Sequence, residues 1–498
     1  MRRFAIIFFS LVILQQTQAQ DVLQPFAIVE QALAVGETES YTFTAREGSI
    51  LSFLAQSTDG TLDPQITLIA PNGDVLLTND DYDYPDRTDA LIEGFTVPRT
   101  GQYAVSVSGV AETAGTFRLE MAEGFPTVVM TDTFATSTDV TSLASAPTII
   151  SQADGALHLS VEGIEQTGVG VHPRAQGDDF YTAVTVKNIT HRNGWLVGLV
   201  LRKQSDDNYY LLQVENRGIW RFLLVQDGIT TVVRDWTDHP ALVAEQTTFR
   251  LSVFANGGGF DAFYDGQYIG TAVDSTITGD GSLGFVVGTQ NAFDSNATAT
   301  FDDFIVTVPT QKDGQRLQPT QILGGTGNVV ARQLQHMSVI PIGGEVALDI
   351  SETTATYNGA GTNLVSLARG STFTNFVYST QVSVSTSRQG IGGCGIVARQ
   401  DGDNYVLAYA DNVGGYGLSQ RVGAEFLQSN FNQYATPTVQ VWLLMIGRSE
   451  DVLLYVDGKY FATITASEIA GNIGNAVVNF DAQETACRFR NVWLWRWN

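Results

Sequence analysis

Positive charge is scarce in this chain of 498 residues: 27 Lys and Arg stand against 52 Asp and Glu, a net charge of −25. Proteins that bind nucleic acids or anionic lipid surfaces use basic side chains to displace counterions. The composition therefore argues against nucleic-acid partners. Cations, neutral glycans and other proteins stay open as ligands.

Charged residues of either sign are also few, at 16 %, whereas hydrophobic residues make up 44 % and aromatic residues 10 %. A disordered chain has the opposite balance. The length is that of two to four domains, each large enough to bury a core. We expect several folded, strand-rich domains.

A long hydrophobic run is present only near the N-terminus, where Arg2 and Arg3 precede the apolar segment 4–14 and Ala19 offers a small-residue cleavage point. This order is typical of a signal peptide over residues 1–20. An uncleaved N-terminal anchor is the alternative. No later segment has about 18 uninterrupted apolar residues, so we expect no transmembrane segment and a secreted or cell-surface protein.

Cysteine and histidine are rare, which limits metal and nucleophile chemistry. Cys394 and Cys487 could form one disulfide in an exported protein, or stay as two buried thiols. No two of the five histidines have the i, i+4 spacing of a helical metal pair, and no nucleophile elbow or phosphate-binding loop is present. We therefore expect a protein that is not an enzyme. The histidines are His158, His172, His191, His239 and His336.

Residues 21–124 alternate apolar and polar positions in short runs between turn residues, as in a β-sandwich. An ordered set of motifs in this segment resembles the bacterial pre-peptidase C-terminal domain, a jelly-roll-like accessory module. The motifs are Asp63–Leu68, Pro71–Gly73, Asn79–Asp81, Asp89–Ile92 and Gly101–Val105.

A longer pattern occurs twice, over residues 130–309 (copy one) and 330–498 (copy two), with a Gly-rich linker predicted at 310–329. Asp-Gly turns between long strands indicate an antiparallel sandwich in each copy. The paired motifs are Gly198–Arg202 with Gly395–Arg399, Asp207–Tyr209 with Asp403–Tyr405, Tyr264–Tyr268 with Val456–Tyr460, and Phe301–Phe304 with Phe489–Val492.

These motifs resemble the concanavalin A-like lectin/glucanase sandwich in its laminin-G-like branch. The predicted fold class is all-β, with three antiparallel, jelly-roll-like β-sandwich domains of which the last two are a duplication. Glycosidases of that fold carry a Glu-x-Asp-x-x-Glu strand, and neither copy has one. The resemblance therefore implies binding rather than hydrolysis.

The densest group of oxygen ligands in the sequence lies in the first module. Such a loop suits Ca²⁺, which would relieve the repulsion among its carboxylates, or it is a solvated loop whose side chains cap turns. The candidate metal ligands are Asn79, Asp80, Asp81, Asp83, Asp86 and Asp89.

Candidate ligand-binding residues follow the repeat. Arg202 and Arg399 stand beside Asp207 and Asp403, either as ligand-binding pairs or as structural ion pairs. Tyr210 could face away from the core. Of the aromatics that could stack on sugars, Trp236 has the most polar surroundings; the others, each more typical of a core, are Trp195, Trp220, Tyr416, Tyr434 and Trp442.

Near the C-terminus, Trp493, Trp495 and Trp497 recur at every second position and share one face of a strand, opposite Val492 and Leu494. Alignment with copy one assigns the core to the Val492 face. The Trp row then forms an exposed partner-binding patch, or it is buried under the linker or a neighbouring sandwich.

Together these features predict a secreted, non-catalytic protein of the bacterial surface or extracellular space that binds glycan or protein. The alternatives are a structural subunit whose sandwiches bind each other, and an accessory chain of a secreted hydrolase.

Overall fold

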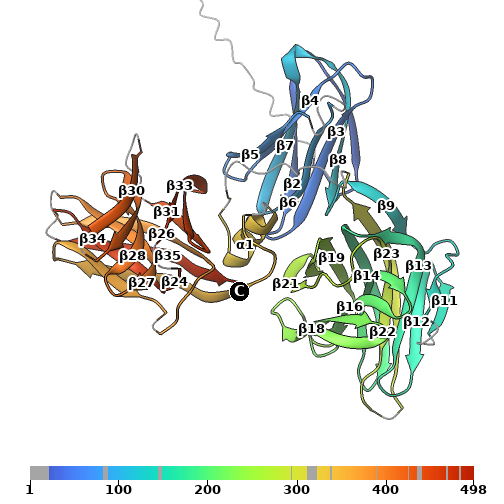
Figure 1. Cartoon of the computed structure of the whole chain (residues 1–498). Helices are drawn as coiled ribbons and strands as arrows, with labels where there is room; N and C mark the ends of the chain where they lie inside the picture. The colour runs from blue at the N-terminus through green and yellow to red at the C-terminus, as the bar shows by residue number, and fades with distance from the viewer. Residues whose placement is uncertain are drawn as a thin grey trace, which may run out of the picture.

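The computed structural model describes residues 22–81, 88–143, 148–292, 294–310, 322, 324–336, 339–368, 370–387, 390–423, 425–434, 440–466, 469–481 and 484–497. The predicted signal peptide, the candidate ligands Asp83 and Asp86, and most of the predicted linker lie outside these residues. The described chain forms three β-sandwiches around one short helix (Figure 1). The predicted all-β fold class is confirmed.

The first sandwich packs two four-stranded antiparallel sheets face to face. Alternate side chains of each strand enter its core, as the sequence alternation predicts. One sheet has the order β1 (Ile28–Leu33), β8 (Gly115–Glu123), β3 (Ile50–Ser57), β6 (Ala90–Thr96); the other has β2 (Thr38–Ala45), β7 (Gly101–Gly109), β4 (Pro64–Ile69), β5 (Val75–Asn79).

The second sandwich is larger and follows directly through β9 (Thr127–Asp132), which pairs with β23. One sheet has the order β10 (Thr141–Ser142), β13 (Thr167–Gly177), β22 (Gly281–Gly288), β15 (Leu196–Ser205), β16 (Asn208–Glu215), β17 (Ile219–Gln226), β18 (Ile229–Asp238). The other has β11 (Ile149–Ala153), β12 (Ala156–Glu162), β23 (Asn296–Val308), β14 (Phe180–Arg192), β19 (Phe249–Asn256), β20 (Gly259–Tyr264), β21 (Gln267–Val273).

The third sandwich has two six-stranded sheets in an order that corresponds to the second. The first, here called the helix-facing sheet, is β24 (Glu345–Tyr357), β35 (Thr485–Arg496), β26 (Phe376–Thr386), β31 (Val441–Arg448), β32 (Asp451–Val456), β33 (Lys459–Thr465). The second is β25 (Gly361–Ser366), β34 (Asn472–Asn479), β27 (Gly392–Asp401), β28 (Asn404–Asp411), β29 (Gly415–Val422), β30 (Glu425–Gln433). Cys394 on β27 and Cys487 on β35 form a disulfide between the two sheets.

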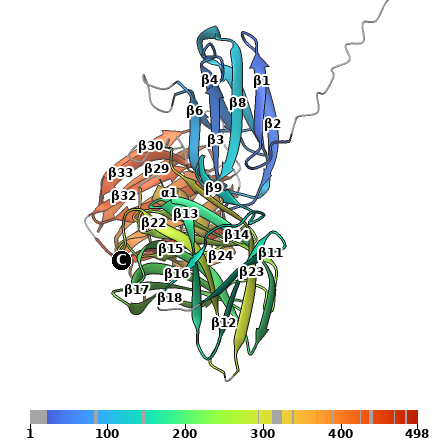
Figure 2. The same ribbon diagram turned by 90° about the vertical axis from the view of Figure 1, so that its right-hand side faces the viewer.

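Helix α1 (Gly327–His336) was not predicted, and the expected domain start at residue 330 falls inside it. Arg332, 1 % exposed, bonds from this helix to the Asp261 carboxylate of the second sandwich at 2.9 Å and to the Gly48 carbonyl of the first at 3.1 Å. The opposite side of α1 packs on the third sandwich through Val330 and Leu334. Both ribbon views place α1 where the three sandwiches meet (Figures 1 and 2).

The first and second sandwiches also meet directly, through a cluster that includes Phe125, Tyr181 and Phe254. Phe125 and Phe254 stack with their ring centroids 4.7 Å apart. The Tyr181 hydroxyl donates to the Glu123 carboxylate at 2.9 Å. Two of the joints between sandwiches are therefore well-packed cores rather than flexible tethers.

Candidate ligand-binding pocket between the sandwiches

The two repeated arginines are structural residues, so the prediction that Arg202 binds ligand is wrong. Arg202 and Arg399 are each 1 % exposed. Arg202 donates to the carbonyls of Asp178 at 2.8 Å, Gly257 at 2.6 Å and Ile277 at 3.1 Å, which ties together three loops at one end of the sandwich.

The expected pairing of Arg202 with Asp207 is not formed; Asp178 and Asp179 are its acidic neighbours, at 3.5 and 3.7 Å. Both arginines have a positive φ, 45° at Arg202 and 52° at Arg399. This turns the side chain out of the strand register and into the end of the sandwich. The alternation of apolar and polar residues along the strand does not predict such a bulge.

Tyr210 also belongs to the core rather than to a ligand site, because it is fully buried. Its hydroxyl donates to the Asp274 carboxylate at 2.6 Å and accepts from the Ile277 amide at 2.9 Å. Burial and the Asp274 bond raise its pKa. Trp195 and Trp220 are buried in the same core.

The row of tryptophans on β35 lies on the outer face of its sheet, as predicted, but it is covered. Trp493 and Trp495 are 3 % and 5 % exposed and pack with α1, and Trp497 is half-buried in the same cluster. Burial under a neighbouring element is therefore the correct alternative. The prediction of Trp495 and Trp497 as an exposed ligand-binding patch is wrong.

Trp236 remains partly exposed, on strand β18 rather than in the loop that its polar neighbours suggested. The Arg221 guanidinium lies 4.4 Å from the centre of its indole and donates to the Gln213 side chain at 2.8 Å. The site is thus an isolated cation–π pair on the second sandwich. The predicted ligand-binding residues do not gather in one place.

Two residues of the candidate calcium loop, Asn79 and Asp89, are held by hydrogen bonds within the first sandwich. Asn79 accepts from the Leu91 amide at 2.8 Å, and Asp89 accepts from the Ser57 amide at 3.2 Å. Burial, then the charges of Asp81 and Asp80, raise the pKa of Asp63; burial and Asp80 raise that of Asp81. Within the described residues no three metal-ligating side chains gather, so the Ca²⁺ site stays a prediction.

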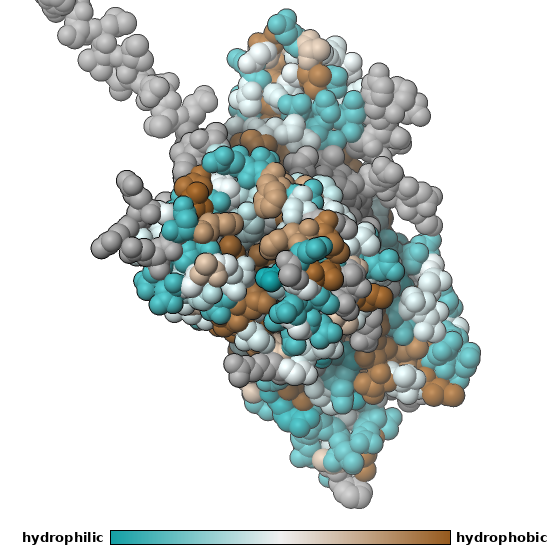
Figure 3. Space-filling model, turned by 60° about the vertical axis from the view of Figure 1, so that its left-hand side comes forward, coloured by the Kyte–Doolittle hydropathy of each residue, from teal (hydrophilic) through white to brown (hydrophobic). Residues whose placement is uncertain are grey.

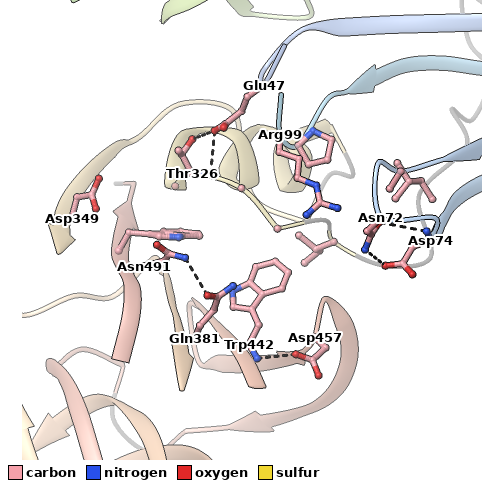
Figure 4. Close-up of a pocket in the computed structure, with 18 residues that line it drawn as sticks. Glu47, Asn72, Asp74, Arg99, Thr326, Asp349, Gln381, Trp442, Asp457 and Asn491 are labelled. Atoms are coloured by element: carbon pink, nitrogen blue, oxygen red, sulfur yellow. Dashed lines mark hydrogen bonds between the residues drawn. The ribbon is translucent and has the colours of Figure 1, made fainter. Parts of the chain in front are cut away.

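A pocket of about 690 Å³ opens where the first sandwich, the segment before α1 and the third sandwich meet. Figure 4 shows its floor and walls. The first sandwich contributes Glu47, Asn72, Asp74 and Arg99; the segment before α1 contributes Ile322 and Gly324–Gly327; the third sandwich contributes Asp349, Gln381, Trp442, Asp457, Asn491 and Trp493.

The floor is the outer face of the helix-facing sheet, beyond the area that α1 covers. Strand register places Trp442 opposite Gln381, and Trp493 opposite both Asp349 and Ser379. Because side chains alternate along each strand, these residues all point out of the core. A flat aromatic and polar surface results.

Trp442 is held in place through both its side chain and its backbone. Its ring nitrogen donates to the Ser379 hydroxyl at 2.7 Å, and its backbone amide donates to the Asp457 carboxylate at 2.8 Å. The Tyr434 hydroxyl also donates to Asp457. The ring is thus pre-organised and half-buried on the pocket floor.

Hydrogen-bonding groups from both sandwiches line the remaining walls. The Asn491 amide donates to Gln381 at 3.2 Å, and Thr326 donates from its hydroxyl to Glu47 at 2.7 Å (Figure 4). Arg99 projects from the first sandwich and is the only basic residue among those lining the described pocket.

Three close approaches at glycines fix the wall formed by Ile322 and Gly324–Gly327, and the two onto carbonyl oxygens leave no room for a Cβ. A Cβ at Gly458 would lie 2.0 Å from the Ile322 carbonyl oxygen, and one at Gly325 would lie 2.7 Å from that of Pro98. Gly327 rests on the Trp493 indole, which a Cβ would approach to 3.1 Å. The Gly-rich composition that suggested a linker therefore serves tight docking.

Sequence reasoning named Trp442 and Trp493 among the aromatics but did not single out the polar residues of the pocket. Gln381, Asn491 and Asp349 lie on outer faces of strands, where polar residues are ordinary and carry no signal of their own. Only the approach of the first sandwich turns that face into a pocket.

Residues 37–109 match the family described as the bacterial pre-peptidase C-terminal domain, which confirms the resemblance predicted for the first module. No curated protein matches the chain. Among solved structures, the carbohydrate-binding module CBM66 from Bacillus subtilis is similar, with 20 % identity over 34 % of this chain and 96 % of that one, at a TM-score of 0.28. The mouse laminin alpha1 chain, domains LG4-5, is similar with 14 % identity over 68 % of this chain and 85 % of that one, at a TM-score of 0.20.

Proposed function

We propose that this is an exported, non-catalytic binding protein that takes a neutral glycan in the pocket between the first and third sandwiches. The Trp442 indole, which lines the pocket and is fixed through its ring nitrogen by Ser379, is the observation that carries the proposal. Flat apolar rings with a polar edge pack against the C–H faces of pyranose rings. The surrounding amides and carboxylates are suitable partners for sugar hydroxyls, and the volume is in the range of small-ligand sites.

The charge of the pocket favours neutral over anionic sugars. Four carboxylates line it, from Glu47, Asp74, Asp349 and Asp457, against the single guanidinium of Arg99. An anionic glycan would meet net repulsion there, in a chain that already has a charge of −25. We expect uronic-acid and sulfated glycans to bind more weakly than neutral ones.

A glycan panel followed by titration calorimetry tests this function. Trp442→Ala should weaken the neutral glycan that binds best by at least about tenfold, which is roughly 1.4 kcal/mol, because the stacking surface is lost. Trp236→Ala is the matched control, since that indole lies on another sandwich. Unchanged binding by the Trp442 variant, or a panel without any neutral ligand, would contradict the proposal.

The proposal also includes export of the protein, binding without catalysis, and duplication of the last two sandwiches. The N-terminal segment supports export, and the protein recovered outside the cell should begin near Gln20. The missing carboxylate pair and nucleophile motifs support binding without turnover, and the bound glycan should be recovered intact after long incubation. The corresponding strand orders and the bulged, buried Arg202 and Arg399 support duplication of the last two sandwiches.

A further inference from the structure

Strand β30 forms one edge of its sheet, and no strand in the described part of the chain pairs with its outer side. Phe426, Leu427 and Phe431 on this strand are 55 %, 57 % and 62 % exposed. The stretch Phe426–Phe431 contains no charge and no proline. Natural proteins usually protect such edges with lysine, proline or a covering element, because an open apolar edge pairs with other strands.

The equivalent edge of the second sandwich is partly protected in that way. Strand β18 exposes Ile229 and Val232, but it also carries Arg234 and Asp235. Its pairing with β17 is interrupted by two irregularities, against one between β29 and β30. Arg234 also donates to the Thr271 carbonyl at 2.9 Å, which ties this edge to the opposite sheet. Strand β30 has no charged side chain between Phe426 and Phe431, so its edge is less protected than that of the corresponding strand β18.

The apolar side chains of β30 continue onto the outer face of its sheet. Register places Phe431 opposite Gly417 and Phe426 opposite Arg421, so both rings lie on the face away from the core. The ring of Phe431 lies 6.3 Å from that of Tyr409, which is 5.7 Å from that of Phe480. Figure 3, in which the third sandwich comes forward, shows brown hydrophobic side chains on this side of the molecule.

We infer that β30 pairs antiparallel with β30 of a second copy of this chain, about a twofold axis at Ser429. Ser429 of the two chains then lie opposite each other, and Leu427 of each chain lies opposite Phe431 of the other, with Phe426 next to this pair. The same surface then serves both partners, as a closed twofold interface requires.

Charge favours a second copy over a basic or acidic partner. The paired stretch is uncharged, and Glu425, the nearest charge on the strand, falls outside it. A charged partner would find no counter-charge along this edge, whereas the strand itself offers matching apolar side chains. The chain's net charge of −25 repels a second copy at a distance, so association should tighten as salt screens it.

Light scattering of the mature protein, from about 1 to 200 µM in 20 and 200 mM NaCl, tests the pairing. We expect a dimer whose dissociation constant falls at the higher salt concentration. Phe426→Lys with Phe431→Lys should raise that constant at least tenfold with an unchanged melting temperature. Ile229→Lys, on the exposed end of β18, is the matched control and should leave the dimer intact.

Asn430→Lys provides a second variant, because it adds charge to an exposed polar side chain and disturbs folding least. Amide hydrogen exchange of residues 425–433 should slow in the dimer. A monomer at 200 µM, a dimer that survives the lysine variants, or a dimer in which these amides stay unprotected would each overturn the inference.

Discussion

Several buried ionisable side chains in this protein make contacts that hold its structure together. His172 is the clearest case, being almost fully buried between Phe134 and Phe304. Its Nδ1 accepts from the Arg174 amide at 3.2 Å, which leaves the proton on Nε2, 3.1 Å from the Asp132 carboxylate. The imidazole is thus a neutral donor inside the second sandwich.

Burial lowers the pKa of His172, although Asp132 partly opposes the shift. The unfolded chain therefore takes up this proton at a higher pH than the folded protein does. The stabilisation that depends on neutral His172 is complete above the ordinary histidine pKa of about 6.5. It is lost as pH falls below that value, by at most about 1.4 kcal/mol per pH unit for one proton.

The urea midpoint of the wild-type protein should accordingly fall between pH 7 and pH 5. His172→Gln keeps an amide donor for Asp132 and cannot titrate, so its midpoint should change less over the same range. Equal pH dependence in the two proteins would show that other groups account for the loss; the carboxyls of Asp63 and Asp81 would act in the opposite direction, because their pKa values are raised in the folded protein.

At the scale of elements, the loop after β5 is where a bound cation would act on stability. Burial, and after it the charges of neighbouring carboxylates, raise the pKa values of Asp63 and Asp81, and a bound cation would offset this cost of ionisation. We expect millimolar CaCl₂ to raise the melting temperature, by a gain of about 2.7 kcal/mol at one hundred times the dissociation constant. Chelator should reverse the change, and Asp80→Asn with Asp81→Asn should abolish it; a chain indifferent to calcium would exclude the site.

The contact between β35 and α1 belongs to the same scale. Trp495 is buried in the cluster that joins them, so Trp495→Ser should lower stability by about 3–5 kcal/mol, as truncation of a core aromatic does. Chemical denaturation measures this. A change below about 0.5 kcal/mol would show that the indole is exposed in solution.

At the scale of the whole molecule, helix α1 contacts all three sandwiches, and Arg332 is its link to two of them. Arg332 bonds to the second and first sandwiches from a helix whose other face packs on the third, and its guanidinium lies 4.3 Å from the centre of the Tyr268 ring. The pocket exists only while these parts stay together, because its floor and walls come from different sandwiches.

Arg332→Met should therefore lower stability by about 3–5 kcal/mol, since it leaves the buried Asp261 carboxylate unpaired. It should also weaken glycan binding at the pocket, although Arg332 does not line it. Combining it with Asp261→Asn removes the unpaired charge and should restore part of the stability. An Arg332→Met protein that unfolds at the wild-type midpoint would show that the sandwiches are held together by other contacts.

The sequence predicted the candidate site only in part. Trp442 could be listed as an aromatic, but nothing near it in the chain distinguishes it from Trp236, which lies alone on another sandwich. Arg202 lies at a bulge in β15 that turns its side chain into the sandwich, and a linear pattern does not record such a bulge. Tyr209 and Tyr210 lie on opposite faces as alternation predicts, but the pattern does not say which of the two faces the core; the structure shows that Tyr210 does.

What the sequence by itself determined is the all-β class, the number and order of the modules, and the core face of the C-terminal strand. These depend on alternation and turn residues within a few positions of each other, which a linear pattern records. Only the tertiary structure decided what happens on the outer faces: burial of the Trp493 row under α1, formation of the pocket, and exposure of β30. Those outcomes depend on which faces of separate sandwiches meet. A local sequence pattern does not show which residues far apart in the chain will come into contact.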